Sequence, residues 1–284
     1  MNEQLIQLLK DRYFDGSTHH ARASVSGGTL SYFPVEGIPT DEEISLHLTG
    51  ELVLGAYTLL PDSTCRWLCL DVDSDDKDKT PIENKQRARN IAREITDKLE
   101  AVDHVVEWSA GKGYHVWVYF AKPMPAADAK AFGLSVREAI GASATGSTHV
   151  EIFPKQATIE KDSPLGNLVK LPLGLHPVTR KQSCFVDPAN GWEDGPLLEP
   201  EKQLIRLVDP AGLSNALNAV DPVNRLIGLL TPFYVAGERH NLTLALAGLL
   251  AGVGWAKDEV EGLITALIEE VGGDADDDAV EDDR

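Results

Sequence analysis

Apolar stretches with the length of β-strands recur along the first two thirds of the chain. Residues 52–60 and 65–72 are both strongly apolar, and a Pro-Asp-Ser-Thr segment between them predicts consecutive strands joined by a turn. Residues 104–108, 114–120 and 148–153 have the same character. Together these segments predict a sheet of several strands at the centre of the protein.

Helical patterns alternate with these strands. Residues 80–101 carry Pro81 in the first turn and apolar side chains at four-residue spacing, which predicts a helix lying across the sheet. Residues 2–10 and 125–140 also predict helices. The alternation of strands and helices is typical of an α/β protein of the α+β kind.

The pattern changes after about residue 200, beyond which helical segments prevail. Residues 237–254 and 256–271 predict a helical hairpin. We therefore expect a catalytic-type domain at residues 1–198, which includes a small cap region at 1–62, and an all-helical module with an acidic tail at 199–284.

Composition narrows the class of protein. The chain has 284 residues, of which 43% are apolar and 25% charged, as in a soluble globular protein. The most apolar stretch, residues 242–253, is shorter than the ~20 residues that cross a bilayer, and the N-terminus has no signal-peptide core. We therefore expect a cytoplasmic protein without a membrane partner. Its cysteines, Cys65, Cys69 and Cys184, predict reduced thiols rather than a disulfide framework or a zinc site.

Net charge limits how the protein can meet nucleic acid. The formal charge is −19, and the acidic tail from Asp274 to Arg284 accounts for part of it. A protein with this charge does not bind nucleic acid over its whole surface. A polyanionic partner would need a local basic groove or a bound metal ion.

Two carboxylates stand at the end of the second apolar strand. Asp71 and Asp73 are two residues apart, so strand alternation places both on one face while Leu70 and Val72 face the core. Neighbouring carboxylates suit Mg²⁺ or Mn²⁺, with substrate phosphates completing the coordination. The alternative is a solvated strand end, which the aspartate-rich run through Asp78 also permits.

A glycine-rich turn separates two of the predicted strands. Ser109-Ala-Gly-Lys-Gly-Tyr-His115 places Lys112, Gly113 and exposed backbone N–H groups in the turn, and His115 just after it. Such a turn can hold a phosphate, and Ser109 and His115 can face the same pocket. A simple β-hairpin with a surface histidine is the alternative.

Further charged residues follow in the next segments. Glu151 lies on the face of the strand at 148–153 opposite Val150 and Ile152, where it can act as a third metal ligand. Lys155 and Lys170 can contact phosphate or serve as ordinary surface charges.

In this order the segments resemble the archaeo-eukaryotic primase superfamily, above all the primase-polymerases of TOTE conflict systems, mobile elements and CRISPR-associated proteins. The resemblance covers most of residues 11–187. It is carried by the Asp-x-Asp strand, the Ser-x-Gly-x-Gly-x-His hairpin, His47-Leu-Thr-Gly50, Val150-Glu-Ile-Phe-Pro-Lys155 and the segment from Asn167 to His176. It implies a core with an RRM-like mixed or antiparallel sheet and flanking helices, and a prokaryotic, viral or mobile-element origin.

The resemblance also implies roles for individual residues. Two metal ions, Mg²⁺ or Mn²⁺, would be held by Asp71, Asp73 and Glu151, with Asp103 or Asp162 as alternatives for the third ligand. The phosphates of the incoming nucleotide would be bound by a set of hairpin and lysine residues: Ser109, Lys112, Gly113, His115, Lys155 and Lys170.

The implied activity is a DNA primase-polymerase that uses an NTP or dNTP on a single-stranded DNA template. A metal-dependent nuclease or phosphohydrolase, and a non-catalytic replication-initiation module that binds nucleic acid, are the alternatives. In relatives the C-terminal region leads on to further helices and sometimes a helicase, so this chain can be part of a longer protein. Arg239 and His240, at the start of a predicted helix, are expected to contact the 5′ end of a primer or the initiating nucleotide.

Overall fold

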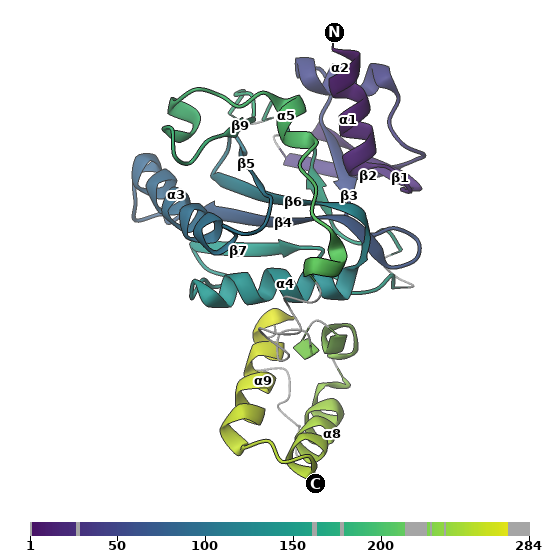
Figure 1. The fold of residues 1–284 in the computed structure, drawn as a ribbon, viewed down its shortest axis with the longest axis vertical. Coiled ribbons are helices and arrows are strands. Elements are labelled where there is room, and N and C mark those ends of the chain that lie inside the picture. Colours follow the sequence, from purple (N-terminus) through teal and green to yellow (C-terminus); the bar gives the residue numbers. More distant parts are fainter. Residues whose placement is uncertain are drawn as a thin grey trace.

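Two antiparallel sheets form the centre of the computed structural model, which describes residues 2–26, 29–160, 164–176, 179–213, 226–227, 229–235 and 237–271 (Figure 1). The larger sheet has the strand order β7-β4-β6-β5-β9. The smaller sheet has the order β2-β1-β3-β8. The strands are β1 (His19–Ser26), β2 (Thr29–Glu36), β3 (Leu54–Tyr57), β4 (Thr64–Ser74), β5 (Val105–Trp108), β6 (Gly113–Pro125), β7 (Thr148–Phe153), β8 (Leu168–Lys170) and β9 (Cys184–Val186).

Helices cover the outer faces of these sheets. On the larger sheet α3 and α4 lie against one face, and α1 lies near the smaller sheet (Figure 1). The helices are α1 (Glu3–Tyr13), α2 (Asp41–Thr49), α3 (Pro81–Lys98), α4 (Ala126–Ala139), α5 (Pro200–Leu204), α8 (Arg239–Gly252) and α9 (Lys257–Glu270), with short 3₁₀ turns at η1 (Trp192–Asp194) and η2 (Thr231–Phe233). In the part of the chain described here, no helix is long and apolar enough to cross a membrane.

Side-chain alternation along β4 divides the interior into two cores. Leu68, Leu70 and Val72 point to the face that α3 and α4 cover. Trp67 and Cys69 point to the opposite face, where they pack with α1 and the smaller sheet. The predicted orientation of the β4 side chains is therefore confirmed, and Asp71 lies on the second face, at the edge of the second core.

Local sequence explains why α3 begins where it does. Thr80 accepts a hydrogen bond from the Glu83 amide, the Glu83 carboxylate accepts from the Thr80 amide, and Pro81 stands in the first turn. This reciprocal capping satisfies amide groups that otherwise lack helical partners. The predicted helix is confirmed.

The region expected to form a small cap is organised differently. Strands β3 and β4 follow each other in the chain, but β3 belongs to the smaller sheet and β4 to the larger one. β8 completes the smaller sheet by pairing with β3, through residues such as Lys170 opposite Gly55. Residues before β4 therefore make a second sheet with a distant strand, a pairing that strand periodicity alone does not encode.

The segment after the expected domain boundary at residue 198 packs on the two-sheet part of the chain. Leu204, in α5, is buried in the second core, and its carbonyl accepts a hydrogen bond from Arg12 (2.6 Å). Val208 pairs with Phe120 of β6. The predicted helical hairpin follows as α8 and α9, on the side of α4 away from the sheet (Figure 1). The acidic tail lies outside the described residues.

Candidate active site

One row of side chains crosses the larger sheet at right angles to its strands. The strand register places Glu151 of β7 opposite Asp71 of β4, Asp71 opposite His115 of β6, and His115 opposite Glu107 of β5. Side chains at directly paired positions lie on the same face of a sheet. Four polar residues from four strands therefore point to the same side.

The surroundings of Asp71 disfavour the ionised form of its carboxyl group. Burial raises the pKa of the Asp71 carboxyl to about 6, the nearby negative charges of Asp73 and Glu151 add to this increase, and His115 opposes it. The Nε2 atom of His115 lies 3.5 Å from Asp71 Oδ1. A cation that approached Asp71 would relieve the repulsion.

Glu107 holds His115 from the other side. This carboxylate is fully buried, and its Oε2 atom accepts hydrogen bonds from His115 Nδ1 (2.8 Å) and Trp117 Nε1 (3.0 Å). Burial by itself would lower the pKa of His115, but the negative charges of Asp71 and Glu107 raise it. Burial by itself would raise the pKa of Glu107, but the interaction with His115 lowers it. His115 is thus fixed as a donor to Glu107, and its Nε2 edge faces the cavity.

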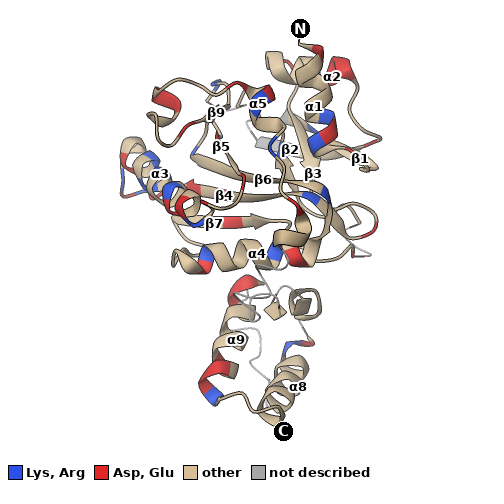
Figure 2. Cartoon of the chain, in the orientation of Figure 1, with Lys and Arg blue, Asp and Glu red and all other residues tan. Residues whose placement is uncertain are grey.

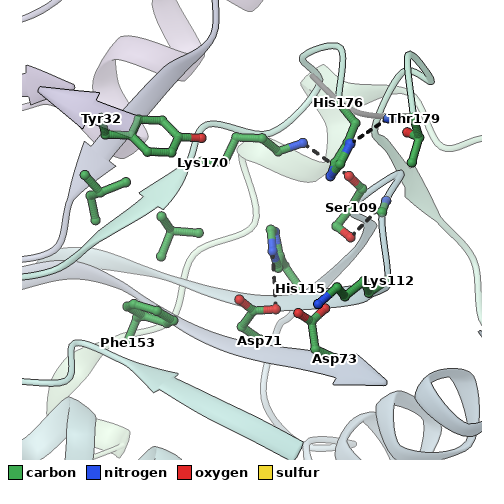
Figure 3. Close-up of a pocket in the computed structure, with 13 residues that line it drawn as sticks. Tyr32, Asp71, Asp73, Ser109, Lys112, His115, Phe153, Lys170, His176 and Thr179 are labelled. Carbon is green, nitrogen blue, oxygen red and sulfur yellow. Dashed lines mark hydrogen bonds and ion pairs between the residues drawn. The ribbon is translucent and has the colours of Figure 1, made fainter. Parts of the chain in front are cut away.

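The cavity itself lies between the two sheets and has a volume of about 530 Å³. Figure 3 shows Asp71 and Asp73 rising from β4 toward His115, with Tyr32 and Lys170 from the smaller sheet above them. This volume is in the range of cavities that hold nucleotide-sized ligands. The residues that line it are Tyr32, Asp71, Asp73, Ser109, Gly111, Lys112, His115, Phe153, Leu168, Val169, Lys170, His176 and Thr179.

The glycine hairpin has a structural reason for its sequence. A Cβ atom on Gly113 would lie 1.6 Å from the Val72 carbonyl oxygen and 3.0 Å from Asp73 Oδ1, so only glycine fits beside the carboxylates. Ser109 Oγ donates to the Gly113 carbonyl (2.9 Å). Ser109 therefore braces the turn from inside while it also lines the cavity.

Two lysines bring positive charge to the cavity. Lys170 donates to the Ser109 carbonyl (3.2 Å), and burial lowers the pKa of its ammonium group. Lys112 forms an ion pair with Asp75 (2.6 Å). Both side chains are exposed, so Lys112 can release Asp75 and bind another anion in its place. Both lysines line the cavity.

Glu151 and Lys155 are arranged differently from the other predicted residues. They form an ion pair with each other (2.7 Å), and neither lines the cavity, although Phe153 between them does. Within the described residues, no three acidic, histidine or cysteine side chains converge on one point as a metal centre. Instead Lys155 neutralises Glu151, and His115 approaches Asp71.

The remaining predicted residues lie elsewhere. Asp103 precedes β5 and pairs with Arg206 (2.9 Å), away from the cavity, and Asp162 is outside the described residues. Arg239 and His240 begin α8 in the helical module, which contributes no described residue to the cavity lining. The structure therefore does not bring these two residues to the carboxylates.

Several residues of the site were not expected from sequence. Glu107, Tyr32, His176 and Thr179 fall in this group. Glu107 left a signal, since it interrupts an apolar strand two residues before Ser109, on the same face as the predicted catalytic residues. The others come from segments that reach the cavity only through the smaller sheet and the loop after β8.

The fold and the cavity together define a two-sheet α/β domain with clustered carboxylates and a histidine between the sheets. A family model described as "TOTE conflict system, Archaeo-Eukaryotic Primase domain" matches residues 33–195, more than half of the chain. The protein belongs to this family. Archaeo-eukaryotic primase domains are typically nucleotidyltransferases of the primase-polymerase kind, and they generally use divalent metal ions.

Solved structures with a similar chain trace include two polymerase domains. One is the polymerase domain from Mycobacterium tuberculosis ligase D in complex with DNA, with 14% identity, a TM-score of 0.35 and coverage of 72% of this chain and 73% of that one. The other is the archaeo-eukaryotic primase domain of the cyanophage S-2L primase-polymerase, with 12% identity, a TM-score of 0.39 and coverage of 72% and 94%. No functionally curated protein matches the sequence.

Proposed function

We propose that the protein is a DNA primase-polymerase. It transfers a nucleotidyl group from an NTP or dNTP to a 3′-hydroxyl, directed by a single-stranded DNA template, and so makes or extends primers. The observation that carries this proposal is the polar row Glu151–Asp71–His115–Glu107, from which Asp71 and His115, together with Asp73, line a cavity of nucleotide size.

The carboxylates suit a divalent metal ion. The raised pKa of Asp71 reflects burial and crowded negative charge, which a hard cation would offset. Asp71 and Asp73 would hold the metal, with Glu151 as a third ligand once Lys155 releases it. Bound there, Mg²⁺ or Mn²⁺ lowers the pKa of a 3′-hydroxyl and stabilises charge on the phosphates.

The protein's own cationic groups fit the triphosphate. His115 donates its Nδ1 proton to Glu107, and its raised pKa favours the doubly protonated ring, whose Nε2–H can be donated to a phosphate oxygen in the cavity. Lys170 and Lys112 add positive charge on the hairpin side. The 3′-hydroxyl then loses its proton to solvent and its oxygen forms a bond to the α-phosphorus, while the bond from that phosphorus to pyrophosphate breaks and pyrophosphate leaves.

Local positive charge also accounts for an acidic protein that acts on DNA. Figure 2 shows Asp and Glu spread over many elements, often beside Lys or Arg as on α3 and α9, rather than gathered on one face. Contact with nucleic acid then depends on the cavity cations and the metal, not on net charge.

The direct test is nucleotide incorporation. The full chain is incubated with single-stranded DNA, Mn²⁺ or Mg²⁺ and labelled NTPs or dNTPs, with and without an annealed primer. We expect labelled products longer than the primer, and we expect Asp71→Asn and Asp73→Asn to reduce them to background. In the absence of metal, both variants should be at least as stable as the parent, because each substitution removes one negative charge from a set of neighbouring carboxylates.

Asp78→Asn is the matched control, since Asp78 belongs to the same aspartate run but is exposed. It should retain parental incorporation. Shortening of the DNA without incorporation would favour the nuclease alternative. Normal incorporation by both site variants at saturating metal would remove Asp71 and Asp73 from the site.

A further inference from the structure

A buried lysine connects the helical module with the catalytic domain. Lys130 lies in the middle of α4, on a face otherwise made of small and apolar residues, and its side chain is 1% exposed. Charged groups are rarely buried this deeply unless they are paired. Burial lowers the pKa of Lys130, and Glu270 opposes that decrease.

The partner of this lysine comes from the last turn of α9. Glu270 lies 3.3 Å from Lys130 through one carboxylate oxygen and 2.8 Å from Arg137 through the other. The side chains of Glu270 and Arg137 are 9% and 13% exposed, so the whole cluster is largely removed from water. Figure 1 shows α9 ending against α4.

A second bond of Lys130 leads toward the active site. Its Nζ atom also donates to the backbone carbonyl of Lys155 (2.7 Å). The side chain of Lys155 in turn lies over the Phe153 ring, 4.9 Å from its centre, and forms the ion pair with Glu151. Contacts thus run from Glu270 through Lys130 to the backbone of Lys155, which lies just beyond the end of β7, the strand that carries Glu151.

We propose that the helical module sets the position of Glu151 beside Asp71, with Glu270 and Lys130 as the positioning residues. This rests on the proposed function, because it takes Glu151 as a ligand of the metal ion. The module is then more than an appended domain, since its final helix anchors the end of the strand that carries a proposed metal ligand.

The physical reason is the balance of buried charge. Without the Glu270 carboxylate, Lys130 and Arg137 would be two cations of like sign in a dry site, and Lys130 would move toward water. The Lys155 carbonyl would then lose its donor. The segment from Glu151 to Lys155 would keep its strand pairing to β4 but lose the anchor just beyond the strand.

The variants separate docking from positioning. Glu270→Gln removes the carboxylate, and Lys130→Met removes the ammonium group while it keeps the Arg137–Glu270 contact that docks the module. Arg137→Met removes a docking contact but leaves Lys130 with both of its partners. Glu269→Gln is the matched control, because Glu269 is the exposed neighbour of Glu270 on the same helix turn.

The readout is Mn²⁺ binding to the full-length protein, measured by electron paramagnetic resonance without nucleotide or DNA. We expect Glu270→Gln and Lys130→Met to raise the dissociation constant for Mn²⁺ about tenfold, as loss of outer partners of metal ligands commonly does. Glu269→Gln should match the parent, and Arg137→Met should have the smaller effect. In primer extension, the Mn²⁺ concentration for half-maximal rate should rise while the rate at saturating Mn²⁺ is retained.

The outcomes are distinct. If the parent binds Mn²⁺ and both positioning variants, shown to be folded by circular dichroism, bind it equally well, the inference is overturned while the proposed function stands. If the parent binds no Mn²⁺, both fail together. Should Glu270→Gln not fold, Glu270→Asp replaces it, and an unchanged dissociation constant there together with Lys130→Met overturns the inference.

Discussion

At the scale of single residues, Glu107 and Trp117 decide how His115 is presented. Both the histidine Nδ1–H and the tryptophan Nε1–H are donated to one oxygen of a fully buried carboxylate. The indole therefore limits where that carboxylate can lie, and the carboxylate limits how the imidazole can turn. Glu107, which does not line the cavity, therefore determines that the Nε2 edge of His115 faces it.

We predict that Glu107→Leu weakens nucleotide binding and lowers the free energy of unfolding by about 2–4 kcal/mol, because two buried donors lose their acceptor. Glu107→Gln keeps an oxygen in place and should retain most of the stability. Calorimetric titration with a nucleotide and thermal unfolding check both effects.

Trp117→Phe is the graded comparison, since it removes one donor and leaves the bond between Glu107 and His115. It should weaken nucleotide binding less than Glu107→Leu does. Equal nucleotide affinity for the parent, Glu107→Leu and His115→Ala would mean that the histidine has only a packing role.

At the scale of elements, two of the segments that carried the family resemblance turn out to be packed on each other. His47, at the end of α2, accepts a hydrogen bond from the Leu54 amide through Nδ1 (3.2 Å) and donates through Nε2 to the Pro172 carbonyl (3.0 Å). A Cβ atom on Gly174 would lie 2.1 Å from the His47 ring. The histidine and the glycine are thus matched, and they tie α2 to the segment after β8.

This contact makes stability depend on pH. Burial lowers the pKa of His47 to about 4, against an ordinary value of 6.5, and the hydrogen bond to the Pro172 carbonyl only partly opposes this decrease. The unfolded chain therefore takes up the proton first as pH falls. The contribution of neutral His47 to the free energy of unfolding is fully present above about pH 6.5. It is lost progressively as the pH falls to about 4, and the loss amounts to about 3 kcal/mol.

We predict that His47→Gln flattens the dependence of the free energy of unfolding on pH between 4 and 6.5. Urea unfolding at several pH values, compared with the parent, measures the change in slope. His19→Gln, at a partly exposed histidine in β1, should keep the parental slope. An identical slope for His47→Gln and the parent would show that His47 does not titrate in this range.

At the scale of the whole molecule, the helical module lies on the far side of α4 from the cavity (Figure 1). The hypothesis that Arg239 and His240 bind the 5′ end of a primer therefore needs a strand that reaches from the cavity around the domain. The positioning role proposed for the Glu270 contact does not depend on those residues. Deletion of the module would disturb both roles at once, so substitutions in the full chain are the better test.

We predict that replacing Arg239 and His240 by glutamine together lowers the ratio of unprimed to primed synthesis several-fold and leaves primed extension intact, because only initiation uses the phosphate contact. Gel analysis of labelled products with and without a primer gives the ratio. Lys257→Gln, an exposed cation on α9, is the control. An unchanged ratio would leave Arg239 and His240 with a structural role only.

The sequence by itself determined several of the strands and helices and the faces of their side chains. Asp71 and Asp73 share a face because strand period is two, α3 begins at its capping residues, and Gly113 marks the tight approach of two strands. Each of these is a local property, decided by backbone geometry over a few residues. The glycine hairpin with Ser109 and His115 could be placed for the same reason.

Only the tertiary structure decided which of those faces meet. The separation of β3 and β4 into two sheets, the alignment of Glu107 with His115, the ion pair that covers Glu151 and the contact of Glu270 with Lys130 all join residues distant in sequence. Such contacts form where burial of apolar faces and pairing of buried charges give the lowest free energy for the whole chain. Local periodicity constrains those choices but does not make them.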